Sequence, residues 1–191
     1  MKLSFLTSLF TKDKKSLTLP DSILIKKLKE ISTKHSFSLF NDVTIFHHAH
    51  AYHFPLIILD ETHGLYIFEK KEWAYDDLKN ATVQKAQHQE TSKETLSFQN
   101  KQDIINQKFN ELTHHSDVPM FNYLLMENLN ADEYEHLHDS FKELIPANKV
   151  IFNDSTVEDI LQKLHNSPAS VYPLPSKDYI LGNLFIQYAI L

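Results

Sequence analysis

Glu69 and Lys71, two positions apart, are the side chains of this sequence best suited to chemistry by type and spacing. They follow an apolar run that starts after Gly64, and such a run bounded by turn residues is typical of a buried strand. Side chains alternate along a strand, so the pair shares one face at the strand's polar end. A carboxylate there can hold a divalent cation, and a lysine can orient water and stabilise phosphate charge. The other interpretation is that both side chains form the solvated end of a core strand.

The stretch from Gly64 to Trp73 reads Gly-Leu-Tyr-Ile-Phe-Glu-Lys-Lys-Glu-Trp. It resembles the Gly-apolar-Glu-x-Lys-x-Trp signature of the nuclease-related domain (NERD) family, which belongs to the PD-(D/E)xK, restriction-endonuclease-like superfamily. The resemblance implies an α/β fold with a restriction-endonuclease-like core, in which helices flank a mixed central sheet. The implied order is helix, three strands, helix, strand, and then helix, strand, helix. The implied activity is that of a divalent-metal-dependent phosphodiesterase, a DNA endonuclease.

On this resemblance, Glu69 would bind Mg²⁺ or Mn²⁺, and Lys71 would orient water and the phosphate. The family places a metal-binding aspartate near the start of the preceding strand, where this chain has Pro55 and Leu56. Asp60, at the far end of that strand, is either a substitute metal ligand or the residue that shapes the turn, a role that aspartate performs well. Metal-dependent phosphodiesterases need at least two converging carboxylates, so we expect a degenerate metal site.

Two further positions depart from the family pattern. Its first helix usually carries a glutamate that faces the active site, and Glu30 matches poorly because the inward positions of this helix are aliphatic. Its Asn-Pro-x-x-Gln helix, whose glutamine lies beside the active site, resembles the segment from Asn100, where Lys101 replaces the proline. We take Gln102 as the catalytic candidate in this segment, with Gln107 as its competitor.

His48 and His50 form a different candidate site. If this piece of chain is extended, the two imidazoles share a face and make a pair that can hold zinc, copper or nickel. The alternative is a hairpin or loop in a chain that contains 12 histidines.

Composition limits the classes of protein that fit. The chain has no cysteine, which excludes disulfides and thiolate metal sites and fits a cytoplasmic protein. Its formal net charge of −6 argues against strong nucleic-acid binding by the whole surface, although Lys26, Lys27 and Lys29 could form a local basic face. Two glycines are too few for a glycine-rich phosphate loop. No apolar run approaches the roughly 18 residues of a membrane span, so we expect no membrane partner.

The chain divides into four parts by its pattern. We expect a tail or docking segment at 1–19, an α/β domain at 20–166 with a polar excursion at 74–98, a proline-rich linker at 167–176 and a C-terminal docking helix at 177–191. Within the domain we expect a helix from Ser22 to near His35, followed by strands at 37–46, 54–59 and 65–68. Later strands are expected at 120–126 and 149–152, one helix opening at Asn130 and another capped by Ser155.

Two functions of different classes follow. The first is a nuclease-fold domain of the NERD type, linked to DNA processing, with a degenerate metal site. The alternative is a non-catalytic nucleic-acid or protein docking module. Because domains of this family often precede helicase-type ATPase modules, the resemblance suggests the N-terminal part of a larger helicase-like protein. The apolar face of 177–191 would then contact a protein partner or a further domain.

Overall fold

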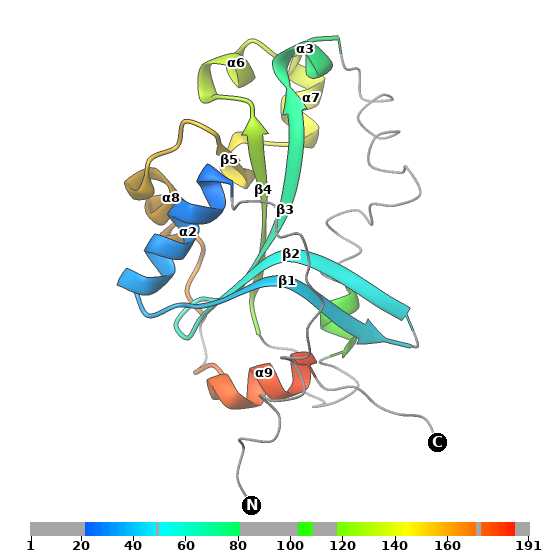
Figure 1. Cartoon of the computed structure of the whole chain (residues 1–191), viewed down its shortest axis with the longest axis vertical. Coiled ribbons are helices and arrows are strands. Elements are labelled where there is room, and N and C mark those ends of the chain that lie inside the picture. Colours follow the sequence, from blue (N-terminus) through cyan, green and yellow to red (C-terminus); the bar gives the residue numbers. More distant parts are fainter. Residues whose placement is uncertain (1–21, 49, 81–102, 109–117, 171–172, 186–191) are drawn as a thin grey trace, which may run out of the picture.

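The computed structural model describes residues 22–48, 50–80, 103–108, 118–170 and 173–185. They form an α/β structure around one mixed five-stranded sheet (Figure 1). The strands are β1 (Ser38–His47), β2 (His50–Asp60), β3 (Gly64–Ala74), β4 (Met120–Asn128) and β5 (Val150–Phe152). The helices are α2 (Ile23–Lys34), α3 (Tyr75–Leu78), α6 (Ala131–Glu135), α7 (Asp139–Leu144), α8 (Val157–His165) and α9 (Lys177–Phe185), with a 3-10 turn η1 (Ala147–Lys149). Residues 103–108 are also helical.

The strand order in the sheet, β1-β2-β3-β4-β5, is the order along the chain. The first three strands form an antiparallel meander, and β4 and β5 continue the sheet in parallel with β3. Strand β3 is therefore central, with an antiparallel neighbour on one side and a parallel one on the other. The α/β class and the flanking helices predicted from the sequence are confirmed.

Helices α2 and α8 cover one face of the sheet. Their apolar residues recur at helical spacing and pack on alternate residues of the central strands, as amphipathic helices do on a sheet. We call this face the α2–α8 face. Its buried residues include Leu24, Leu28, Ile31, Ile58, Tyr66, Phe68, Tyr123, Ile160 and Leu164.

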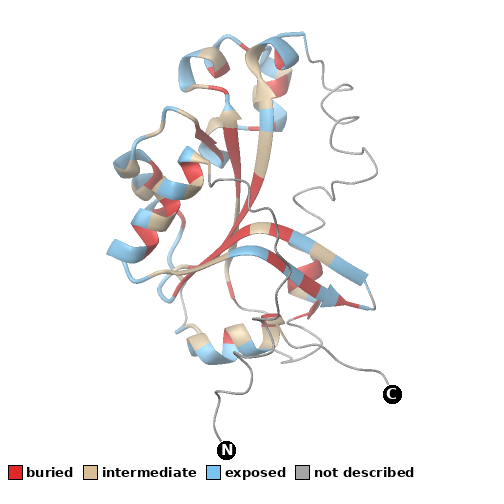
Figure 2. Ribbon diagram, in the orientation of Figure 1, coloured by how far each residue is buried: buried red, intermediate tan, exposed pale blue. Residues whose placement is uncertain are grey.

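Two further apolar clusters cover the opposite face. Helix 103–108 and α9 contribute Ile105, Ile180 and Leu184 to a cluster with β1, β2 and β3. The short helices α3, α6 and α7 pack instead on β4 and β5. Figure 2 shows the buried positions concentrated where β2, β3 and β4 run side by side. The described part of α9 is thus packed on this chain's own sheet.

The turn between β2 and β3 requires glycine. Gly64 has a φ of 124°, a conformation that residues with a side chain rarely adopt. A Cβ at this position would lie 2.2 Å from the carbonyl oxygen of Pro119. That carbonyl accepts a hydrogen bond from the amide of Leu65 at 2.9 Å. The missing side chain therefore lets the strand start close to the segment that leads into β4.

Several expected boundaries were wrong. Strand β3 does not end at Phe68 but continues to Ala74, because β4 keeps pairing with it. The helix expected to run on from Asn130 is two helices, α6 and α7. Helix α8 is capped by Thr156 rather than Ser155, and its capping box closes through Asp159. The capping box of Asn130 is confirmed.

The longest described helix, α2, has 12 residues, and none of the described helices combines the length and apolarity that crossing a bilayer requires.

Candidate functional site

Glu69 and Lys71 lie in the body of β3, on one face of the sheet. Glu69 pairs with Leu124 of β4 and is 4% exposed, while Lys71 pairs with Met126 and is half-buried. Both alternate with Phe68, which points to the α2–α8 face, so they point to the opposite face. The shared face is as the spacing predicts, but the pair is not the solvated end of the strand.

Trp73 continues the same row of side chains. The ammonium of Lys71 lies 5.0 Å from the centroid of the Trp73 ring, within the range of a cation–π interaction. The register of β3 with β4 shifts between Lys71 and Ala74, but Trp73 still packs with Leu124 and Met126, on the face to which Glu69 and Lys71 point. This row, Glu69–Lys71–Trp73, is the candidate site.

The described pairing of β2 with β3 stops before Glu69. Its last pair is Leu56 with Phe68. Leu56 points to the α2–α8 face. The regular alternation of β2 is interrupted around Pro55, because Phe54 and Ile57, three positions apart, both lie in the cluster on the opposite face. Neither Pro55 nor Leu56, the two positions where the resemblance implies an aspartate, carries a carboxylate.

Asp60 lies at the other end of β2 and shapes the turn. Its Oδ1 accepts hydrogen bonds from the amides of Thr62 at 2.7 Å and His63 at 3.3 Å. Its Oδ2 lies 2.7 Å from Nδ1 of His63. Asp60 pairs with Gly64, five positions before Glu69, so the two carboxylates are separated by about 16 Å along the sheet. Asp60 also alternates with Leu59 and follows Ile58 onto the α2–α8 face, the face opposite Glu69.

The described donor set does not fit the Mg²⁺ or Mn²⁺ that the resemblance implies. Such ions take several oxygen ligands, and the structure does not bring Asp60 and Glu69 together. Among the residues described, no group of three or more histidine, cysteine, aspartate or glutamate side chains is placed to hold a metal ion. Glu69 is thus a single described carboxylate in its row.

The remaining family positions do not add to this row. Gln102 lies outside the described residues. Its competitor Gln107 is exposed on helix 103–108. Glu30 is exposed on α2, where its carboxylate accepts from Lys34 at 2.6 Å, and α2 covers the face opposite Glu69.

The histidines between β1 and β2 do not share a strand face. His48 lies in the turn with a φ of 47°, and His50 is the first residue of β2 and is exposed. The ring of His48 instead packs on that of His47, with 4.0 Å between centroids. The predicted His48–His50 metal pair required an extended chain at these residues, and the structure has a turn there instead.

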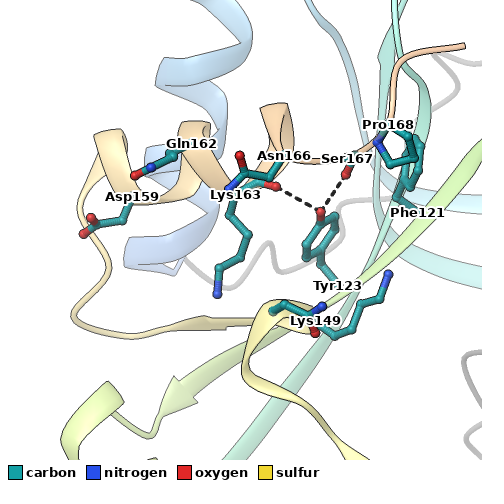
Figure 3. Close-up of a pocket in the computed structure, with 10 residues that line it drawn as sticks. Phe121, Tyr123, Lys149, Asp159, Gln162, Lys163, Asn166, Ser167 and Pro168 are labelled. Atoms are coloured by element: carbon teal, nitrogen blue, oxygen red, sulfur yellow. Dashed lines mark hydrogen bonds between the residues drawn. The ribbon is translucent and has the colours of Figure 1, made fainter.

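A pocket on the α2–α8 face lies away from Glu69. It measures about 530 Å³, between the end of α8, the start of β4 and η1 (Figure 3). At its base, the hydroxyl of Tyr123 donates to the carbonyl of Lys163 at 3.2 Å and shares a hydrogen bond of 2.8 Å with Ser167. The ammonium of Lys149 lies 5.8 Å from the Tyr123 ring centroid. Ser167, placed in the predicted linker, is therefore part of the packed domain.

Burial shifts the pKa values of two side chains in this pocket. It raises the pKa of the Tyr123 phenol and lowers the pKa of the Lys163 ammonium, because each charged form loses hydration there. The Lys163 ammonium donates to the carbonyls of Ala147 and Val150. These bonds tie α8 to the start of β5, so Lys163 has a structural role.

A second group of residues, a cluster of histidines, was not predicted from the sequence. His63, His165 and His35 come from the β2–β3 turn, the end of α8 and the end of α2, and they meet around Asp60. No local spacing signals this, because about a hundred residues separate His63 from His165. The turn residue Asp60 was the one member singled out.

Comparisons with protein-family models, curated proteins and solved structures found no match to this chain.

Proposed function

We propose that the chain is a nuclease-fold domain of the NERD type, linked to DNA processing, with a degenerate metal site. The observation that carries the proposal is the row Glu69–Lys71–Trp73 on the central strand, while neither Pro55 nor Leu56 supplies a carboxylate. The motif residues retain a common face, while the neighbouring strand lacks the carboxylate that metal-dependent phosphodiester hydrolysis needs.

The order of elements supports the same family. Helix α2 precedes an antiparallel meander of three strands, a helical segment at 103–108 precedes β4, and β4 is parallel to β3. Helices α6 and α7 then lead to β5, and α8 follows. This is the sequence of elements that the restriction-endonuclease-like core implies. The motif falls on the third strand of the meander, as it does in that core.

The alternative is a non-catalytic docking module of the same fold. The separation of Asp60 from Glu69 across the sheet favours it, because a domain without converging carboxylates can still bind a partner through its surface. The net charge of −6 makes a protein, or another domain of a helicase-like protein, a better partner for such a module than DNA.

The test is cleavage of supercoiled plasmid and single-stranded DNA in Mg²⁺ and in Mn²⁺. We expect no cleavage by the wild type. Pro55→Asp supplies a carboxylate at one of the two positions where the resemblance implies an aspartate. It is expected to create metal-dependent cleavage, which Glu69→Gln in the same chain should abolish. Pro168→Asp, at an exposed proline far from this row, is the matched control and should stay inactive.

Two outcomes would change the conclusion. Cleavage by the wild type that is lost in both Glu69→Gln and Lys71→Ala would show a complete site and overturn the degenerate one. A folded Pro55→Asp chain that neither cleaves nor binds DNA would reject the link to DNA and leave the docking module.

A further inference from the structure

A second pocket, on the α2–α8 face, is independent of the Glu69 row. It measures about 410 Å³ and is lined by the β2–β3 turn and by the ends of α2 and α8. Three imidazoles, of His35, His63 and His165, lie in its wall together with Asp60. Figure 1 shows the β2–β3 turn close to the ends of these two helices. Imidazoles are the ligands that zinc, copper and nickel favour.

Asp60 fixes the orientation of His63. The Asp60 side chain is 6% exposed, and its Oδ2 lies 2.7 Å from Nδ1 of His63. A carboxylate can only accept hydrogen bonds, so Nδ1 of His63 carries the hydrogen and Nε2 is the nitrogen that can coordinate a ligand. The two turn amides on Oδ1 hold the carboxylate in place. A carboxylate behind the distal nitrogen of an imidazole is the usual support of a metal-binding histidine.

His165 supplies a second imidazole at a suitable separation. The two rings are stacked, with 5.8 Å between their centroids and 21° between their planes. Two imidazoles on one ion, each with a metal–nitrogen bond of about 2.0–2.1 Å, have centroids about 5–6 Å apart. His35 lies 6.0 Å from His165 at 84° and does not complete a three-residue group. Within the described chain, the site therefore offers two protein nitrogens, and water would supply the other ligands.

The local field favours a cation. Helix α8 ends at His165, and α2 ends at Lys34 with His35 as its C-cap. The carbonyls at both helix C-termini carry partial negative charge toward the pocket. Glu61, also in the lining, is exposed beside Asp60 and adds a carboxylate. These charges would oppose an anionic ligand and attract a metal ion.

We propose that His63 and His165 bind a divalent transition-metal ion, Zn²⁺, Ni²⁺ or Cu²⁺, with Asp60 as the positioning residue. The ion would link the β2–β3 turn to the end of α8. This site uses nitrogen ligands and lies on the opposite face from Glu69, so it holds whether or not the Glu69 row has any nuclease activity.

The test is Zn²⁺ titration of the untagged full chain by calorimetry, with thermal unfolding in parallel. We expect binding that raises Tm, an affinity at least about tenfold weaker in His63→Ala and in His165→Ala, and an affinity about 10–100-fold weaker in Asp60→Asn. Circular dichroism without metal checks that each variant is folded. The matched control is the double variant His48→Ala/His50→Ala, which should bind Zn²⁺ as the wild type does.

A measurement on the unaltered chain covers the case in which a variant fails to fold. Electron paramagnetic resonance of bound Cu²⁺ resolves coordinated nitrogens, and we expect about two of them. Absence of Zn²⁺ binding by the wild type would overturn the proposal. So would binding that survives loss of His63 and His165 but disappears in the His48/His50 double variant, because the site would then lie at the β1–β2 turn.

Discussion

Tyr66 joins the centre of the sheet to α8. Its side chain is fully buried, and its hydroxyl donates to the carbonyl of Leu164 at 3.1 Å. Burial is the main cause that raises the pKa of this phenol, and the charge of Asp60 adds to it. The folded chain therefore holds the phenol proton more tightly than the unfolded chain does.

This predicts a pH dependence for Tyr66→Phe. Near neutral pH the variant should lose about 0.5–1.5 kcal/mol of unfolding free energy, the net value of the hydrogen bond. Above about pH 10 the unfolded wild type releases the phenol proton, so its advantage over the variant should shrink by about 1.4 kcal/mol per pH unit. Urea unfolding between neutral and alkaline pH measures this, with Tyr179→Phe, at an exposed tyrosine, as the control. A difference that stays constant with pH would contradict the assignment.

Gly64 is the second residue whose substitution has a clear expected effect on stability. Gly64→Ala should destabilise the fold by at least about 1–3 kcal/mol, because of the backbone strain, with the contact to Pro119 adding to that cost. Gly182, the other glycine of the chain, is the control, since nothing lies within 4 Å of a Cβ there. Gly182→Ala, inside α9, should be neutral or stabilise by about 0.5–1 kcal/mol. Equal effects of the two substitutions in urea unfolding would show that the turn tolerates a side chain.

At this scale, the sequence predicts neighbours along one strand and fails for neighbours across the fold. The shared face of Glu69 and Lys71 follows from strand alternation alone. The extent to which these two side chains are buried does not follow from alternation, because it depends on the pairing of β3 with β4. The contact of His63 with His165 depends on how α8 packs beside the β2–β3 turn, which no local pattern contains.

At the scale of elements, α9 is the one whose role the structure changes most. Its apolar face was predicted to dock on a partner or a further domain. In the structure, Ile180 and Leu184 are each 1% exposed and pack with Val43 and Ile45 of β1. Residues 186–191 lie outside the described range, so the expectation for the end of the helix stays a prediction.

Truncating this face should therefore destabilise the isolated chain. Ile180→Ala and Leu184→Ala should each cost about 2–5 kcal/mol of unfolding free energy, as for other buried aliphatic residues. Tyr179→Ala, on the exposed side of the same helix, should change it by less than about 0.5 kcal/mol. Urea unfolding of the three variants decides this. If Ile180→Ala proves as mild as Tyr179→Ala, the apolar face is open in solution and available to a partner.

Element predictions succeeded where local signals dominate. Helix α2 begins after Ser22, whose hydroxyl accepts from the amide of Ile25, and ends one residue before His35, as expected. Strand β2 was predicted to begin at Phe54, but it begins at His50 because β1 pairs with it as far as the hairpin turn. Strands β2 and β3 are therefore longer than the sequence predicted, because pairing with a neighbouring strand extends them beyond their apolar runs.

For the whole molecule, the proposal of a degenerate nuclease fold rests on one combination of features. Glu69, Lys71 and Trp73 share one face of the central strand, Asp60 lies on the other face, and neither Pro55 nor Leu56 is a carboxylate. The absence of an acid at Pro55 and Leu56 can be read from the sequence. The distance of Asp60 from Glu69 could be decided only from the register of β2 and β3.

The most direct measurement is Mn²⁺ binding followed by electron paramagnetic resonance, because it reports the metal site whether or not DNA is cleaved. We expect the wild type to show no bound Mn²⁺ that depends on Glu69. Pro55→Asp should bind about one Mn²⁺ per chain, and adding Glu69→Gln should remove it. Bound Mn²⁺ in the wild type that disappears in Glu69→Gln would contradict the central claim, since the metal site would then be complete.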